Sequence, residues 1–304
     1  MLFVFIFFGA IALAFANCLN VKYIRGSAVG AARSSTFVLG GSFLAGSVFF
    51  IFLWLVLWYA GVVTVPTAHT FWLALAATIT INVLFEFFRF RAYALTDLGV
   101  VAPFGAIAPV LTIVTGWFLL KEIPTIGGTV GIMVVAASIY LLHLQGPFTW
   151  KTIVQPLQAI WLHKGTRYAF LSSVPPAVSI IFDKQAVAAA DPISFATVAY
   201  VGIGLGAWGL DIVQQGWPQF KKQILSAPPQ RFLAIGFFHF LASVAFTITL
   251  LMALVPYISA LRRTVIIFEI LFGYLLLHQR TNLRRRLYAG AGVVAGVLLI
   301  AFFR

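Results

Sequence analysis

Long apolar stretches separated by short polar connections dominate this chain of 304 residues. Apolar runs bounded by glycine, proline or charge predict ten helices, most of them near the ~20 residues that a helix needs to cross a bilayer. The pattern therefore predicts an all-α membrane protein with ten transmembrane helices. The predicted spans are residues 2–19, 36–60, 71–95, 99–120, 126–144, 168–189, 193–214, 232–254, 258–278 and 286–303.

The two halves of this pattern resemble each other. The segment "APVLTIVTGWFLLKE" (108–122) aligns with "VIIFEILFGYLLLHQ" (265–279) through a glycine, an aromatic residue and a Leu-Leu pair, and a glycine-rich span follows each. Because five helices are an odd number, a second copy enters from the opposite membrane face, as in many secondary transporters. We predict two inverted five-helix repeats and a connection. Their bounds are 1–145 for the first repeat, 146–166 for the connection and 167–304 for the second repeat.

The connection has an amphipathic pattern of its own. In "FTWKTIVQPLQAIWLHKG" the apolar residues recur at helical spacing, and lysine and glutamine occupy other positions. This predicts a short helix lying in the headgroup layer, interrupted at Pro156.

Composition supports a lipid environment. The chain is 62% hydrophobic and 9% charged, whereas soluble domains carry roughly 25% charged residues. The net charge of +13 comes mostly from bases in the connections, where they set orientation and meet anionic headgroups. We therefore expect the lipid bilayer as a partner, no nucleic acid, and a multi-pass protein of the bacterial inner membrane. Because the odd-numbered connections hold most of the bases, both termini are predicted to face outward.

Candidate chemistry for catalysis or metal binding is sparse. The single cysteine, Cys18, excludes a disulfide within one chain and a cysteine-based zinc site. No phosphate-binding loop of the Walker type is present, so direct use of ATP is not expected. We expect no metal, no cofactor and no enzymatic activity.

Charged and amide side chains inside the predicted spans form a candidate substrate site. An arginine at mid-bilayer costs roughly 2.5–3.5 kcal/mol, so such residues face the bundle interior. In the ninth span, Arg262 and Glu269 share a helix face and Arg263 flanks it. Similar polar stripes run along the third and sixth spans. The candidate substrate-binding residues are Asn17, Asn82, Glu86, Arg89, Asp183, Lys184, Arg262, Arg263 and Glu269.

Two alternatives stay open for these residues. Glu86 with Arg89, or Arg262 with Glu269, could be closed pairs that only fix helix packing, and Asp183 could mark a helix end at the interface. Four bases against three acids in the set nevertheless call for an anion, which a carboxylate or phosphate on the cargo would supply, although lipid headgroups or lost protons could serve too.

Three segments of the sequence resemble the repeat of a known family. "RAYALTDLGVVAPFGAIAPVLTIVTGWFLLKE" (91–122), "IFDKQAVAAADPISF" (181–195) and "ALVPYISALRRTVIIFEILFGYLLLHQ" (253–279) resemble the EamA-type repeat of the drug/metabolite transporter superfamily. The resemblance implies two inverted repeats around a central cavity, working by alternating access. It relates Glu122 to the glutamate that closes the family's first repeat. The second copy departs from the family by ending in His278–Gln279.

The resemblance also relates Arg262–Arg263 and Asp183–Lys184 to the family's basic pair of the ninth helix and its Asp-Lys pair of the sixth. Family members are often drawn with both termini in the cytoplasm, opposite to the charge bias of this chain.

These observations predict a secondary active transporter, with export as the favoured direction. Its cargo would be a small polar or amphipathic metabolite, anionic or zwitterionic, moved with protons or by exchange. One alternative is a flippase for a lipid-linked headgroup. A remote alternative is an intramembrane aspartic protease using Asp183 and Asp211, although the Gly-x-Gly-Asp segment of that family is missing.

Overall fold

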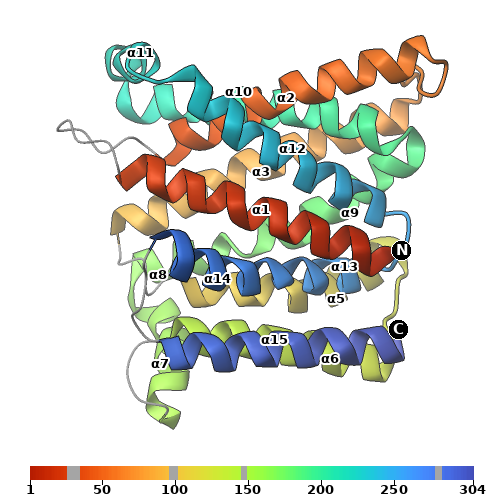
Figure 1. Cartoon of the computed structure of the whole chain (residues 1–304). Helices are drawn as coiled ribbons and strands as arrows, with labels where there is room; N and C mark the ends of the chain where they lie inside the picture. Colours follow the sequence, from red (N-terminus) through yellow and green to blue (C-terminus); the bar gives the residue numbers. More distant parts are fainter. Residues whose placement is uncertain (26–34, 96–101, 145–148, 278–282) are drawn as a thin grey trace. The chain divides into compact units, whose positions relative to one another are not determined.

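The computed structural model describes residues 1–25, 35–95, 102–144, 149–277 and 283–304 (Figure 1). Over these residues the chain is helical and forms no β-strand. The elements are α1 (Leu2–Arg25), α2 (Ser35–Tyr59), α3 (His69–Leu95), η1 (Ala102–Ala106), α5 (Ile107–Leu120), α6 (Ile126–His143), α7 (Trp150–Leu162), α8 (Lys164–Leu171), α9 (Val174–Ala189), α10 (Pro192–Gln215), α11 (Trp217–Leu225), α12 (Pro229–Thr249), α13 (Val255–Leu261), η2 (Arg262–Thr264), α14 (Val265–Leu277) and α15 (Leu283–Phe303).

Within the described part of the chain, seven helices are long and apolar enough to cross a membrane: α1, α2, α3, α6, α10, α12 and α15. The all-α prediction is therefore confirmed, and the chain is an integral membrane protein by this criterion. Ten spans in two repeats remain a prediction.

The other three predicted spans are interrupted helices. The span at 99–120 contains the short 3₁₀ helix η1 before α5, and the span at 258–278 is divided by the 3₁₀ turn η2. The span at 168–189 breaks at Ser172–Ser173, between α8 and α9. That break has a local cause, because Pro175 and Pro176 have no N–H to continue the hydrogen bonding of α8 but fit the first turn of α9.

The chain packs as two compact units. The first comprises Met1–Val83, Phe182–Met252 and Leu271–Gln279, and the second comprises Leu84–Ile181, Ala253–Ile270 and Arg280–Arg304. Each unit contains segments of both predicted repeats. The division into repeats remains a prediction, and its boundary at 145/146 lies outside the described residues.

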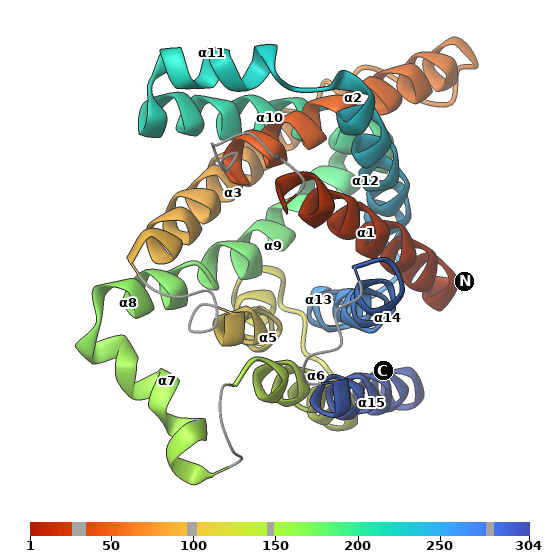
Figure 2. The same cartoon turned by 60° about the vertical axis from the view of Figure 1, so that its left-hand side comes forward.

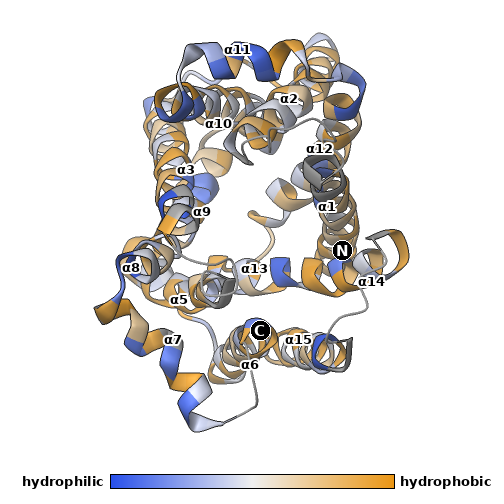
Figure 3. Cartoon of the chain, turned by 90° about the vertical axis from the view of Figure 1, so that its left-hand side faces the viewer, coloured by the Kyte–Doolittle hydropathy of each residue, from blue (hydrophilic) through white to orange (hydrophobic). Residues whose placement is uncertain are grey.

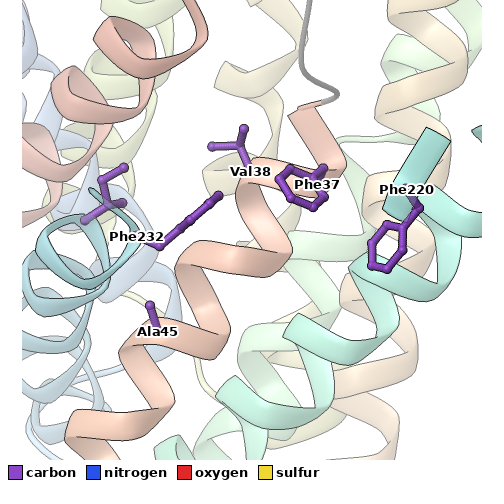
Figure 4. Packing of buried hydrophobic residues seen from close by; sticks show 6 residues of the cluster. Phe37, Val38, Ala45, Phe220 and Phe232 are labelled. Atoms are coloured by element: carbon purple, nitrogen blue, oxygen red, sulfur yellow. The ribbon is translucent and has the colours of Figure 1, made fainter. Parts of the chain in front are cut away.

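In the first unit, α2 lies between α10 and α12, and α1 lies beside α12 (Figure 1, Figure 2). Glycine allows the closest approach, since a Cβ on Gly236 of α12 would meet the backbone nitrogen of Gly46 on α2 at 2.5 Å. The aromatic core of this unit joins α2 to α11 and α12 (Figure 4). There the ring of Phe37 lies 5.8 Å from that of Phe220 and 5.9 Å from that of Phe232.

In the second unit, α6 and α15 lie side by side, and α5 and α13 pack near them (Figure 1, Figure 2). Gly131 of α6 faces Gly296 of α15, where a Cβ on either would meet the carbonyl oxygen of the other at 2.8 Å. Tyr257 of α13 ties these elements together, because its hydroxyl accepts a hydrogen bond of 2.8 Å from the backbone N–H of Thr125, the N-cap residue of α6.

The helices α7 and α11 differ from the spans in alternating hydrophilic and hydrophobic residues (Figure 3). On α7 the side chains of Trp150 and Trp161 are 80% and 82% exposed. The amphipathic helix expected in the connection is confirmed, while its position in the headgroup layer stays a prediction. The expected interruption at Pro156 is wrong: α7 continues through it, although proline cannot donate the backbone hydrogen bond of that turn.

Candidate functional site

The predicted basic pair lies at a break in an apolar helix. The 3₁₀ turn η2 follows α13 directly and precedes α14, and it consists of Arg262, Arg263 and Thr264. The side chain of Arg262 is exposed and that of Arg263 is half-buried. The Nε atom of Arg263 is buried and has no hydrogen-bond partner among the described residues. The break therefore presents one accessible guanidinium and one that is incompletely satisfied.

A 3₁₀ turn lies within the ninth span, at Arg262–Thr264. The spacing that put Arg262 and Glu269 on one face used 3.6 residues per turn throughout. A turn of 3.0 residues adds about 20° per residue, so Arg262 and Glu269 remain within about 40° of each other around the helix axis. Arg262 and Glu269 each have an interaction partner in the structure, and their joint role in a polar site stays a prediction.

Glu86 and Arg89 form a closed pair within α3. Nη2 of Arg89 lies 2.5 Å from Oε2 of Glu86, and Glu86 is only 4% exposed. The guanidinium of Arg89 also lies 5.1 Å from the centre of the Phe85 ring. These contacts satisfy both charges within one turn of helix, as the packing alternative predicted for this pair.

Asp183 is tied across two helices of the first unit. Thr78 of α3 donates a hydrogen bond of 2.8 Å to Oδ1 of Asp183 on α9. The Asn82 amide donates to the carbonyl oxygen of Thr78 at 2.9 Å. Because α9 continues to Ala189, Asp183 lies inside a helix rather than at its end.

Glu122 occupies a helix N-terminus in the second unit. Its Oε2 accepts a hydrogen bond of 2.6 Å from the backbone N–H of Val255, the first residue of α13. The N-cap residue Leu254 provides no side-chain hydrogen bond to that helix, so Glu122 supplies the acceptor that Leu254 lacks. The reach of Glu122 depends on Lys121, which ends α5 in the left-handed conformation at φ 57°.

The structure also contains a buried polar group around His239 that is not among the site residues predicted from the sequence. In the first unit Nδ2 of Asn20 on α1 lies 3.4 Å from Nε2 of His239 on α12. The Ser42 hydroxyl of α2 donates to Oδ1 of Asn20 at 3.3 Å, and the Tyr200 hydroxyl donates to the carbonyl oxygen of His239 at 3.0 Å. The sequence signal was weak, because one amide at a helix end and one histidine in an apolar run are each common.

The nine predicted site residues divide between the two units. Asn17, Asn82, Asp183 and Lys184 belong to the first unit, and Glu86, Arg89, Arg262, Arg263 and Glu269 belong to the second. Hydrogen bonds connect Thr78 with Asp183 and with Asn82, and Glu86 with Arg89. A single site formed by all nine stays a prediction.

Comparison with known proteins gives the fold but no family. No protein-family model and no curated protein matches the chain. Twenty-five chains of solved structures match. One of them, described only as a "Crystal structure of protein", aligns with a TM-score of 0.72 over 99% of this chain and 97% of its own length, at 15% sequence identity. At that identity the similarity concerns the fold alone. The chain thus has a fold known from solved structures along nearly its whole length.

Proposed function

We propose that the chain is a secondary active transporter of the EamA type that carries a small anionic or zwitterionic metabolite. The observation that carries this proposal is the basic break η2, which places Arg262 and Arg263 between the apolar helices α13 and α14. An arginine facing hydrocarbon costs roughly 2.5–3.5 kcal/mol, so a guanidinium exposed at mid-span requires water or polar groups around it. Secondary transporters use interrupted helices of this kind at their binding sites.

The interrupted helices support ten spans rather than seven. Besides the seven long helices, η1 with α5, α8 with α9, and α13 with α14 each cover one of the predicted spans. Counted as discontinuous spans, they complete two five-helix repeats. Under this proposal the repeats are inverted and alternate access to the two sides of the membrane, as the resemblance to the EamA repeat implies.

We infer the charge of the cargo from the hydrogen-bond partners of the arginine side chains. Arg89 is paired with Glu86, whose Oε2 lies 2.5 Å from Nη2 of Arg89. Arg263 retains a buried Nε without a partner among the described residues. Guanidinium groups bind carboxylates and phosphates through several N–H donors at once. A carboxylate or phosphate on the cargo is therefore the group that we propose Arg262 and Arg263 bind.

The acidic residues suggest how transport would be driven. Asp183 sits inside α9 with a hydrogen bond from Thr78, and Glu269 lies on α14 one helix turn beyond the basic break. Either carboxyl could bind a proton in one state and release it in the other. We propose that transport across a bacterial inner membrane is proton-coupled or works by exchange, with export as the favoured direction.

Flux through reconstituted protein tests it. Proteoliposomes would be assayed with radiolabelled inorganic phosphate, succinate and glutamate, which represent a phosphate, a carboxylate and a zwitterion. We expect saturable flux of at least one probe, its loss in Arg262→Ala and Arg263→Ala, and normal flux in the matched control Lys151→Ala, whose lysine is exposed on α7. Equal flux in all four proteins would remove the basic break from the mechanism.

The flippase alternative gives a different result in the same vesicles. A fluorescent anionic lipid placed in one leaflet would become accessible to a quencher added on the other side. Lipid movement that depends on Arg262 and Arg263, without flux of any soluble probe, would replace the metabolite transporter by a flippase.

A further inference from the structure

In the second unit, the last turn of α6 lies beside the first turn of α15. The two helices are side by side (Figure 1, Figure 2) and antiparallel. Gly131 of α6 faces Gly296 of α15, and Ser138, further along α6, faces Gly292, which comes earlier in α15. Continued at this spacing, the register places His143, the last residue of α6, opposite the first turn of α15.

Two hydrogen bonds fix the groups at this end of the helix pair. Nη1 of Arg285 on α15 donates to the carbonyl oxygen of Leu144, the residue that follows α6. Nδ1 of His143 lies 2.9 Å from the carbonyl oxygen of Ile139, and because a carbonyl can only accept, Nδ1 is the donor. A guanidinium group has five N–H donors, so the bond to Leu144 uses only part of the donor capacity of Arg285.

The electrostatic surroundings of the His143 ring are positive. The guanidinium groups of Arg263 and Arg286 lie close enough for their charges to act on the ring. The bond from Arg285 goes to a neutral carbonyl oxygen, which leaves the positive charge of that side chain in place. The opposite charge of Glu269 acts on Arg263. We call His143 and these three arginines the basic cluster, and its three guanidinium charges exceed the one negative charge of Glu269.

The sequence offers the basic cluster few other counter-charges. No aspartate or glutamate occurs in residues 123–182 or in residues 270–304, which include α6, α7, α8, α15 and the connections on both sides of the cluster. Elsewhere in the second unit, Glu86 belongs to the closed pair within α3, and Glu122 lies before the opposite end of α6. Asp97 lies outside the described residues. Excess positive charge in a partly buried place is unfavourable unless an anion accompanies it.

The surface beside the basic cluster suits a lipid. Leu287 and Tyr288, which follow Arg286 on α15, are 59% and 77% exposed. The amphipathic helix α7 is attached to the same end of α6, because the Tyr140 hydroxyl donates to the carbonyl oxygen of Ile153 at 2.7 Å. Guanidinium groups beside exposed apolar side chains match a phosphate group beside acyl chains.

We propose that the basic cluster binds the phosphate group of an anionic phospholipid, with Arg285 and Arg286 as its direct contacts. Guanidinium groups bind phosphate oxygens through several N–H donors at once. Basic pockets between membrane helices on the cytoplasmic side bind anionic headgroups, and the distribution of bases in the sequence predicts that this end of α6 and α15 is cytoplasmic. Lipid binding here does not require that the protein transport anything.

Lipid binding to the detergent-purified full chain tests the site. The protein would be titrated in neutral detergent with phosphatidylglycerol, which is anionic, and with phosphatidylcholine of the same acyl chains, which is zwitterionic. Native mass spectrometry counts the bound lipids. Thermal unfolding reports their effect on the fold, because a ligand that binds only the folded state raises its stability. We expect phosphatidylglycerol to bind in preference to phosphatidylcholine and to give the higher melting temperature.

Variants of Arg286 assign the site. Arg286→Gln removes the charge but keeps a long polar side chain, and we expect about tenfold weaker binding of phosphatidylglycerol. Arg286→Lys keeps the charge and should retain most of the lipid preference. The matched control Lys221→Gln removes an exposed base from α11 in the first unit and should leave phosphatidylglycerol binding unchanged. The comparison of the two lipids on the wild-type protein needs no variant, so it stays decisive if Arg286→Gln does not fold.

Soluble phosphate separates a lipid site from a general anion site. We expect equal melting temperatures in sodium phosphate and in sodium chloride of equal ionic strength. A higher melting temperature in phosphate that depends on Arg286, together with equal binding of the two lipids, would assign the basic cluster to a soluble anion and overturn the lipid site. Equal binding of the two lipids alone, or the same loss of preference in Lys221→Gln as in Arg286→Gln, would also contradict the proposal.

Discussion

Replacement of Glu122 by alanine offers the sharpest test of how the second unit is held together. Oε2 of Glu122 accepts the backbone N–H of Val255 at 2.6 Å, and the residue that follows, Pro256, has no N–H of its own. The carboxylate therefore satisfies one of the few free donors at the start of α13. In Glu122→Ala this donor loses its acceptor, and the negative charge at the helix N-terminus disappears.

The expected loss of stability follows from these two effects. A hydrogen bond to a charged group contributes about 1.5–3 kcal/mol, and a charge near a helix end contributes about 0.3–1 kcal/mol when exposed. Since Glu122 is half-buried, we take the lower end of the combined range and expect a loss of about 2 kcal/mol in the free energy of unfolding. Glu122→Gln keeps a neutral acceptor and should lose about 0.5–1 kcal/mol.

The assay is denaturant unfolding in detergent micelles, followed by far-ultraviolet circular dichroism. The neighbouring variant Lys121→Gly serves as the control, because glycine adopts the left-handed conformation of residue 121 without strain. It should change the free energy of unfolding by less than about 1 kcal/mol, because relief of the left-handed strain is offset by the greater freedom of glycine in the unfolded chain. If Glu122→Ala and Glu122→Gln both unfold like the wild-type protein, the capping role assigned to Glu122 is incorrect.

Two further predictions concern the packing of the first unit. Thr78→Val should cost about 1–3 kcal/mol of unfolding free energy because it removes the hydrogen bond that Thr78 donates to Asp183. A double-mutant cycle with Asp183→Asn should give a coupling energy of about 1 kcal/mol; a coupling near zero would mean that this hydrogen bond contributes nothing. Gly236→Ala should cost about 1–3 kcal/mol, because its Cβ would meet the backbone of the neighbouring helix at 2.5 Å. Gly209→Ala has no atom near its added Cβ and should instead raise stability by up to about 1 kcal/mol; equal effects of the two alanines in thermal unfolding would contradict the close contact.

Local sequence pattern predicts most of the helices because it depends on residues close together in the chain. The run at 126–144 corresponds to α6 at Ile126–His143, and the run at 193–214 corresponds to α10 at Pro192–Gln215. Apolar length alone determines such elements. The same pattern failed at Pro156, where a continuous helix overrides the ordinary effect of proline.

The 3₁₀ turn η2 was not predictable from the pattern. No glycine or proline marks Arg262–Thr264, and the apolar run on both sides is that of an ordinary span. Its three residues shift the following helix by about 20° each, which leaves Arg262 and Glu269 within about 40° of each other around the axis. The closed pair of Glu86 and Arg89, by contrast, could be foreseen as an alternative from the sequence, because their contact lies within one turn of α3.

Hydrogen bonds between residues distant in the chain could not be predicted from the sequence, for a different reason. The hydrogen bond between Thr36 and Asp211 joins residues 175 positions apart, and the one between Thr78 and Asp183 joins residues 105 apart. Only the packing of α2 on α10 and the position of α3 against α9 create these contacts. In the sequence, Asp211 is a lone acid near a helix end.

The central claim is that the basic break at Arg262 faces water within the membrane, and thiol labelling tests it most directly. In a Cys18→Ser background, Arg262→Cys and Leu271→Cys would be treated in proteoliposomes with a charged, membrane-impermeant thiol reagent. Leu271 is the matched control because it is 47% exposed on the adjoining apolar helix α14. We predict rapid labelling at position 262 and slow labelling at position 271. Equal labelling of the two positions, or labelling of position 271 alone, would contradict the account.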